Sequence, residues 1–176
     1  MSDDRPIGLF DSGVGGLTVL HAVQRALPTE STIYLGDLAR CPYGTRPQSE
    51  VREFAVEIGD LLADLNVKLL VIACNTATAA AFDTLQKRYS FPVIGVIEPG
   101  VRAALTSSQR QTIGVIATDG TVASGAYRNA LHVRAGGAVT VHERSASWLV
   151  PIIEWGPLAR PVVAERLGPV MSEMQS

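Results

Sequence analysis

The chain has 176 residues, of which 47% are hydrophobic and 18% charged, and its formal net charge is −2. This composition is typical of a globular protein and excludes a disordered or collagen-like chain. The charge balance gives no reason to expect a nucleic acid or an anionic membrane surface as a partner. No apolar run approaches the roughly 20 residues of a membrane-spanning helix, and the acidic N-terminus does not resemble a secretory signal.

The cysteine content points to a reducing compartment. Cys41 and Cys74 are the two cysteines, too few for a disulfide framework or for a zinc site built from CxxC motifs. We therefore expect a cytoplasmic protein without a bound metal, in which an exposed cysteine can act as a thiolate.

Short apolar runs alternate with longer amphipathic segments along the chain. The runs that we predict to be strands cover residues 7–10, 32–35, 68–73, 92–97, 112–117 and 138–143. The segments that we predict to be helices cover residues 17–27, 50–65 with Ser49 as cap, 75–88, a stretch opening at 98–100, 121–131, and most of the chain from Trp148, with breaks near Pro151 and Gly156. Near-continuous apolar strands separated by helices indicate an α/β fold, with a parallel sheet covered by helices on both faces.

Two segments of the chain are loosely alike. IGLFDSGVGGLTV near the N-terminus, within residues 7–20, compares with IGVIATDGTVASG within residues 112–125. This similarity predicts two related α/β domains, which we place at residues 1–97 and 98–176.

Polar residues follow the first three predicted strands. Ligands of open α/β sheets bind beyond the carboxyl ends of the strands, so we expect these polar groups to share one site. Tyr43 and Gly44 offer a hydroxyl and a backbone N–H to a ligand there; the alternative is an ordinary Pro-Tyr-Gly turn. The groups are Asp11 and Ser12 after the first strand, Asp37 and residues 42–44 after the second, and Cys74, Asn75 and Thr76 after the third.

Residues 11–16, DSGVGG, form a glycine-rich turn between a strand and a helix. Free backbone N–H groups at such a turn favour an anion, although the glycines also suit a merely tight turn. The turn is not a dinucleotide fingerprint, because Thr18 replaces the last glycine, and it lacks the lysine of a P-loop. Asp11 favours a functional interpretation, since a carboxylate suits an ammonium group or a proton transfer better than a phosphate.

Cys74 stands at the junction of a strand and a helix. A lone cysteine is most often a small buried apolar side chain. A helix N-terminus, however, lowers the pKa of a thiol towards neutrality, so Cys74 is expected to supply a thiolate that acts as a base or a nucleophile. No histidine stands at an obvious strand end, which disfavours nucleophilic catalysis by a Cys–His pair.

These motifs, in this order, resemble the cofactor-independent aspartate/glutamate racemase family. The resemblance extends over residues 7–154 and is specific in combination, although each motif alone is weak. The matching segments are DSGVGGLTV (11–19), GD (36–37), PYG (42–44), ACNTATAA (73–80), VIGVIEPG (93–100), IGVIATDGTVASGAY (113–127) and WLVPIIE (148–154).

The resemblance implies a two-domain α/β enzyme that interconverts L- and D-glutamate and so supplies D-glutamate for peptidoglycan synthesis. In the family, one thiolate removes the α-proton and a second thiol delivers a proton to the opposite face, without pyridoxal phosphate, a metal or any other cofactor. Cys74 matches one of these two acid/base residues. A small-molecule substrate is implied, and a homo-oligomer is left open. The residues implied to contact the substrate are Asp11, Ser12, Tyr43, Gly44, Asn75, Thr76, Thr118 and Thr121.

The sequence departs from the family pattern in one respect. The second catalytic cysteine of the family belongs to a GCTHYP-like motif, which is absent here, and Cys41 lies in the loop before PYG. The family's final strand and helix, which return to the first domain, are also absent. We therefore expect a C-terminally truncated chain with an incomplete second domain that exposes apolar surface. Cys74 alone is expected to exchange the α-proton of one enantiomer rather than to racemise efficiently.

Two other functions stay open at this point. One is a racemase of another acidic amino acid, such as aspartate. The other is a non-catalytic remnant that binds a small carboxylate or a protein. A nucleotide-binding Rossmann domain is disfavoured by Thr18.

Overall fold

A computed structural model describes residues 3–108, 112–154 and 160–175. Strands and helices alternate along the chain, and every pair of neighbouring strands is parallel. The described strands form a four-stranded sheet of order β2-β1-β3-β4 and a two-stranded sheet of order β5-β6. The prediction of an α/β fold with parallel sheets flanked by helices is confirmed.

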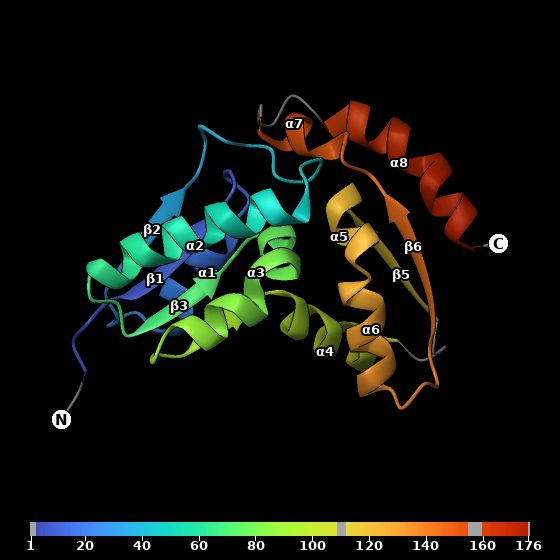
Figure 1. Ribbon diagram of the computed structural model, residues 1–176. Helices are drawn as coiled ribbons and strands as arrows, with labels where there is room; N and C mark the ends of the chain where they lie inside the picture. The colour runs from blue at the N-terminus through green and yellow to red at the C-terminus, as the bar shows by residue number, and fades with distance from the viewer. Residues whose placement is uncertain (1–2, 109–111, 155–159, 176) are drawn as a thin grey trace.

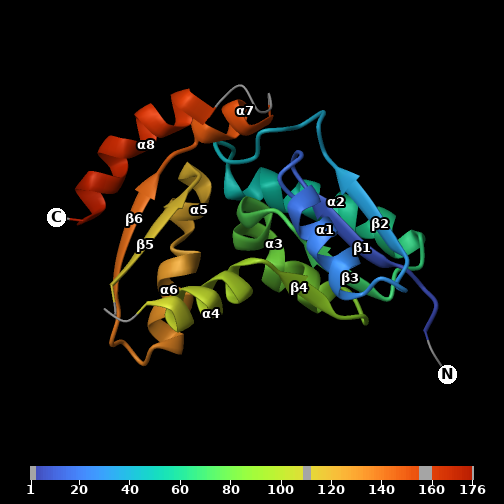
Figure 2. The same ribbon diagram turned by 180° about the vertical axis from the view of Figure 1, so that it is seen from behind.

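The four-stranded sheet is covered on both faces. Figure 1 shows α2 and α3 in front of the sheet, and Figure 2 shows α1 on the opposite face. All five residues of β1 are buried, as expected of a central strand that is apolar on both faces. The elements of this half are β1 (Ile7–Asp11), α1 (Leu17–Ala26), β2 (Thr32–Gly36), α2 (Gln48–Asp64), β3 (Leu69–Ile72), α3 (Asn75–Arg88) and β4 (Val93–Gly95).

The remaining elements surround the two-stranded sheet. A second core, with Val101, Ile113 and Leu131 at its centre, lies between α4, α6 and the sheet. The proposed division into domains of residues 1–97 and 98–176 stays a prediction. The elements are α4 (Ile97–Ser107), β5 (Thr112–Ala117), α5 (Asp119–Ser124), α6 (Ala126–Arg134), β6 (Thr140–Ser145), α7 (Leu149–Glu154) and α8 (Arg160–Gln175).

Two details of the predicted helices are wrong. Ser49 does not cap α2, because this helix begins at Gln48 and no side chain caps its first turn. The helix predicted over residues 121–131 is two helices, because Gly125 adopts a φ of 64° and ends α5. This left-handed conformation costs glycine little and other residues much more.

The region around α7 also differs from the prediction. Pro151 does not break the helix, since it lies within the first turn of α7, where a backbone N–H has no helical partner. The break predicted at Gly156 lies outside the described residues. None of the helices in the described ranges has the length and apolar character that a membrane crossing requires.

The burial of the sheet predicts how sensitive the fold is to truncation of a core side chain. Leu70 on β3 is fully buried, whereas Leu38 is 63% exposed. We expect Leu70→Ala to lower the free energy of unfolding by about 2–5 kcal/mol and Leu38→Ala by much less, because only the first leaves a cavity. Urea unfolding followed by circular dichroism measures both. Equal losses in the two variants would contradict this packing.

Candidate functional site

The register of the first sheet brings three chain segments together. Asp11 pairs with Gly36 at the end of β2, and the N–H of Asp37 donates to the carbonyl of Asp11 at 2.9 Å. The N–H of Ala73, which precedes Cys74, donates to the carbonyl of Phe10 at 2.8 Å. The polar residues predicted at three strand ends therefore lie at one edge of the sheet, as expected.

Cys74 is held at the start of α3. Its Sγ accepts the N–H of Ala77 at 3.4 Å, so the thiol caps the helix. The same Sγ lies 3.6 Å from Oγ of Ser12, to which the thiol donates. The side chain is only 5% exposed. Two elements that are 62 residues apart in the chain thus fix the position of this sulfur atom.

The expected direction of the thiol pKa is wrong. Burial, together with the negative charge of Asp11, raises the pKa of Cys74 to about 11, although the contacts with Ala77 and Ser12 act in the opposite sense. Loss of solvent disfavours the thiolate more than the helix N-terminus favours it. The raised pKa favours the protonated thiol of Cys74 at neutral pH.

Asp11 shapes the glycine-rich turn. Its Oδ2 accepts the N–H of Gly13 at 3.2 Å and that of Gly16 at 2.9 Å, and its side chain is buried. The carboxylate thus folds the turn back onto the end of β1. This contact places Ser12 next to Cys74.

Glu154 is a site residue that the sequence did not single out. Both carboxylate oxygens of Glu154, at the end of α7, accept the N–H of Val14 at 3.1 Å. The N–H groups of Gly13, Val14 and Gly16 are therefore bonded to carboxylates within the chain, and the binding of a ligand anion by this turn stays a prediction. The motif WLVPIIE contains Glu154, but nothing in its spacing indicates a contact with a turn 140 residues away.

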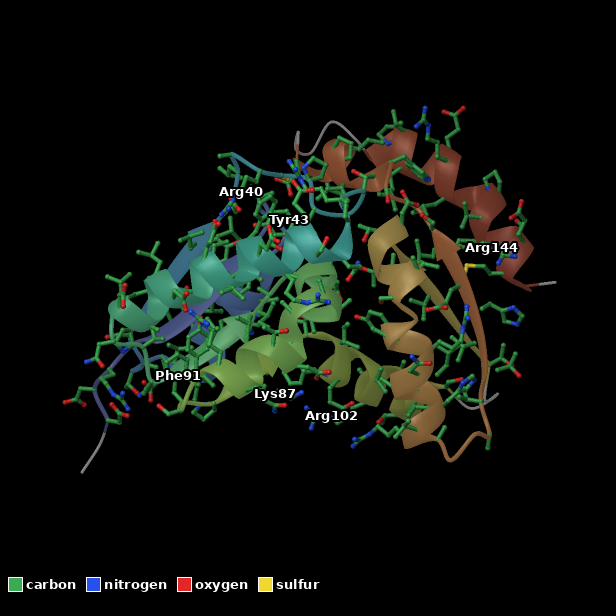
Figure 3. All side chains as sticks on the ribbon, in the orientation of Figure 1. Arg40, Tyr43, Lys87, Phe91, Arg102 and Arg144 are labelled. Atoms are coloured by element: carbon green, nitrogen blue, oxygen red, sulfur yellow. The ribbon has the colours of Figure 1, made fainter. Side chains whose placement is uncertain are left out.

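Asp37 links the Pro-Tyr-Gly loop to the sheet. The Tyr43 hydroxyl donates to Oδ2 of Asp37, and Arg40 donates to the same oxygen at 2.6 Å. Arg40 also pairs with Glu57 at 2.5 Å and lies over the ring of Phe54. Arg40 and Tyr43 are labelled in Figure 3. Tyr43 is buried, and its hydroxyl is engaged inside the protein, so that its contact with a ligand stays a prediction.

Three hydroxyl groups join α3 to α5. Oγ1 of Thr76 lies 2.9 Å from that of Thr118 and 3.4 Å from that of Thr121, and the latter two are 3.0 Å apart. Next to them, the N–H of Gly120 donates to the carbonyl of Gly44 at 2.8 Å. A side chain at Gly44 would collide with Thr118, so the close approach requires glycine. Predicted site residues from both halves of the chain therefore meet at the helix N-termini.

Asn75 is the exposed member of this group. Its Oδ1 accepts the hydroxyl of Tyr127, on α6, at 2.6 Å. The bond orients the carboxamide, because its oxygen is used and its NH2 group is turned the other way.

The described residues contain no group of three or more histidine, cysteine or acidic side chains placed to hold a metal ion. The site instead combines a buried thiol, two buried carboxylates and a cluster of hydroxyls at helix N-termini. These groups are suited to binding a small zwitterion and to moving a proton. They define an α/β protein with a buried thiol at the carboxyl edge of a parallel sheet.

Comparison with known proteins identifies the family. The family model described as Asp/Glu/Hydantoin racemase matches residues 8–174. A glutamate racemase of Oceanobacillus iheyensis is 49% identical over 170 residues, which cover 94% of this chain and 62% of the relative. A glutamate racemase of Staphylococcus aureus is 48% identical and covers 91% of this chain and 60% of that relative. The chain belongs to the Asp/Glu/hydantoin racemase family and spans about three fifths of the length of these curated relatives.

Solved structures of glutamate racemases are also similar to this chain. A crystal structure of a glutamate racemase isoform from Bacillus anthracis has a TM-score of 0.83 at 46% identity, covering 86% of this chain and 56% of the other. A glutamate racemase from Francisella tularensis, in complex with D-glutamate, has a TM-score of 0.83 at 39% identity, covering 93% and 63%. An aspartate racemase homologue from Pyrococcus horikoshii is only 14% identical and supports the fold alone.

The surroundings of Cys74 predict how its thiol titrates. In a Cys41→Ser background, we expect Asp11→Asn to lower the pKa of Cys74 from about 11, because the nearby negative charge that opposes ionisation is removed. The control is Asp64→Asn, at the exposed end of α2. Ultraviolet absorbance of the thiolate, followed against pH, measures the shift. An unchanged midpoint in Asp11→Asn, or an equal change in the control, would contradict the assigned cause.

The negative charge of Glu154 is expected to affect the reactivity of Cys41. Burial and then the charge of Glu154 are the leading causes that raise the pKa of Cys41. We expect Glu154→Gln to speed alkylation of Cys41 by about two- to fivefold at a fixed pH in a Cys74→Ala background, since more thiolate forms. Glu165→Gln, an exposed position on α8, is the control. Slower alkylation in Glu154→Gln would show that Glu154 does not oppose ionisation of Cys41.

Proposed function

We propose that this chain carries the Cys74 side of a glutamate racemase site and binds glutamate at the carboxyl edge of the first sheet. The observation that carries the proposal is the position of Cys74, between Ser12 and the N-terminus of α3, in a chain whose relatives are glutamate racemases. The Francisella tularensis relative, whose structure is a complex with D-glutamate, supports glutamate as the substrate. A cytoplasmic location and a role in supplying D-glutamate for peptidoglycan belong to the same proposal.

The substrate α-carboxylate is assigned to the hydroxyl cluster. Thr76, Thr118 and Thr121 gather three hydroxyls within hydrogen-bonding distance of one another, and Thr76 lies in the first turn of α3. The first N–H groups of a helix, and its dipole, favour a negative charge. The NH2 group of Asn75, oriented by Tyr127, adds a donor at the exposed rim. These donors also stabilise the charge that the carboxylate gains when the α-proton leaves.

The ammonium group is assigned to Asp11 and Ser12. Pairing with an ammonium neutralises the charge of Asp11, and this charge otherwise raises the pKa of Cys74. Substrate binding therefore promotes ionisation of the same thiol that must accept the proton. Tyr43 and Gly44 are assigned to the neighbouring side of the site, where the bond from Gly120 holds their loop against α5.

The proposed reaction is the transfer of one proton from the Cα atom of the substrate to the sulfur atom of Cys74. Cys74 first loses its thiol proton to solvent. The Cα–H bond of the substrate then breaks, its electron pair remains on the substrate and is delocalised into the carboxylate, and the α-proton moves to the Cys74 thiolate. Return of a proton from the thiol, after exchange with solvent, regenerates the same enantiomer. Inversion requires an acid on the opposite face, and only the Cys74 face is assigned here.

Solvent isotope exchange tests the proposal. The 176-residue chain is incubated separately with L- and D-glutamate in D2O, and deuterium uptake and inversion are measured by mass spectrometry and chiral chromatography. We expect deuterium uptake into one enantiomer. The rate of this uptake should fall by about 10²-fold or more in Cys74→Ala and be retained in Cys41→Ser. No uptake with either enantiomer, or equal uptake in Cys74→Ala, would refute the assignment. Faster exchange with aspartate than with glutamate would refute the substrate.

A further inference from the structure

Both backbone polar groups of Gly120, in the first turn of α5, are bonded to elements around the first sheet. The N–H of Gly120 donates to the carbonyl of Gly44 at 2.8 Å, and its carbonyl accepts the side-chain Nε2 of Gln48 at 3.0 Å. A Cβ atom at residue 120 would lie only 3.0 Å from this nitrogen, so glycine permits the close approach. Gln48 is the first residue of α2 and was not among the site residues predicted from the sequence.

The contacts of Gly120 matter because α5 cannot hold its own position. The helix has six residues, Asp119–Ser124, too few to be stable in isolation, so its place depends on contacts with its neighbours. Thr118, which caps α5, and Thr121 stand on either side of Gly120 in the chain and supply two of the three clustered hydroxyls. A displacement of Gly120 would therefore move both hydroxyls relative to Thr76 on α3.

The hydroxyl cluster alone cannot fix α5 once a carboxylate is bound. The hydroxyls of Thr76, Thr118 and Thr121 lie 2.9–3.4 Å from one another, and each has a single proton to donate. A proton that is donated to the substrate carboxylate is no longer available for a bond between two hydroxyls. The bonds of Gly120 to Gly44 and Gln48 involve no hydroxyl, so they are kept when the substrate binds.

We propose that Gln48 is a positioning residue, whose side-chain amide holds Gly120 and thereby keeps the hydroxyls of Thr118 and Thr121 in place for the substrate carboxylate. The bond from Gly120 to Gly44 joins two backbone groups, so Gln48 is the partner that a substitution can remove without altering the loop. The identity of the ligand rests on the proposed function, whereas the hold of Gln48 on α5 is independent of it.

Amide hydrogen exchange of the 176-residue chain, without substrate, tests the hold on α5. Gln48→Glu replaces the donor by a carboxylate that the carbonyl of Gly120 repels, and Gln48→Lys keeps a donor. The dipole of α2 acts in the opposite sense, because a negative charge in the first turn stabilises a helix and a positive one destabilises it. We expect the amides of α5 to exchange about tenfold faster in Gln48→Glu than in Gln48→Lys, with those of β1 equal in both.

The half-saturating concentration of glutamate in the deuterium exchange assay tests the link to the substrate. The neutral variant Gln48→Met is used here, because a new charge would itself alter the binding of an anion. We expect this concentration to rise by about two- to tenfold, the range for loss of one hydrogen bond. Gln86→Met, at an exposed position of α3, is the control and should leave it unchanged. A merely structural role of Gln48 would lower the amount of folded protein and so the maximal rate, without changing this concentration.

The results that would overturn the role of Gln48 differ from those that would refute the proposed function. The role is overturned if α5 exchanges equally fast in Gln48→Glu and Gln48→Lys, or if glutamate half-saturates Gln48→Met and the unaltered chain at the same concentration. Absence of deuterium uptake in the unaltered chain would instead refute the proposed function. The amide exchange of α5 would then decide by itself whether Gln48 holds this helix.

Discussion

The parallel alignment of β1 with β2 and β3 is the constraint on which the site depends. Because all three strands run the same way, their carboxyl ends lie together, and the polar residues that follow them meet at one edge. The turn after β1 is then drawn in by the carboxylate of Asp11, which brings Ser12 to the sulfur atom of Cys74. The hydrophobic core thus fixes the strand ends, and a buried carboxylate fixes the loop between them.

The charged side chains at the carboxyl edge of the first sheet limit which ligands can bind there. Asp11 and Asp37 are buried beside it, and Glu154 reaches it from α7. Arg40, whose side chain bonds to Asp37, is shared between Asp37 and Glu57. A phosphate would meet uncompensated negative charge there, whereas an amino acid can present its ammonium to the acidic groups and its carboxylate to the hydroxyl cluster. The charge distribution therefore supports the proposed class of ligand.

Much of this arrangement could be predicted from the sequence, and the rest could not for physical reasons. Strands of apolar residues and amphipathic helices leave a periodic signal, so the α/β fold and the shared strand edge were predictable. The pKa of Cys74 was not, because a helix N-terminus is visible in the sequence but the degree of burial is not. The split at Gly125 depends on a single left-handed residue. The contact of Glu154 with Val14 could not be predicted, because the two residues are 140 positions apart and no local sequence pattern indicates the contact.

That contact between Glu154 and Val14 also bears on how the molecule folds. A bond that closes a loop of nearly the whole chain cannot form until both sheets exist, since the entropy of closing the loop is offset only by structure already formed. The helices and the neighbouring parallel strands need shorter loops. The first sheet therefore acquires its thiol and its glycine-rich turn before the turn receives its carboxylate partner. In a nascent chain from which Glu154 has not yet emerged, the N–H of Val14 lacks this partner.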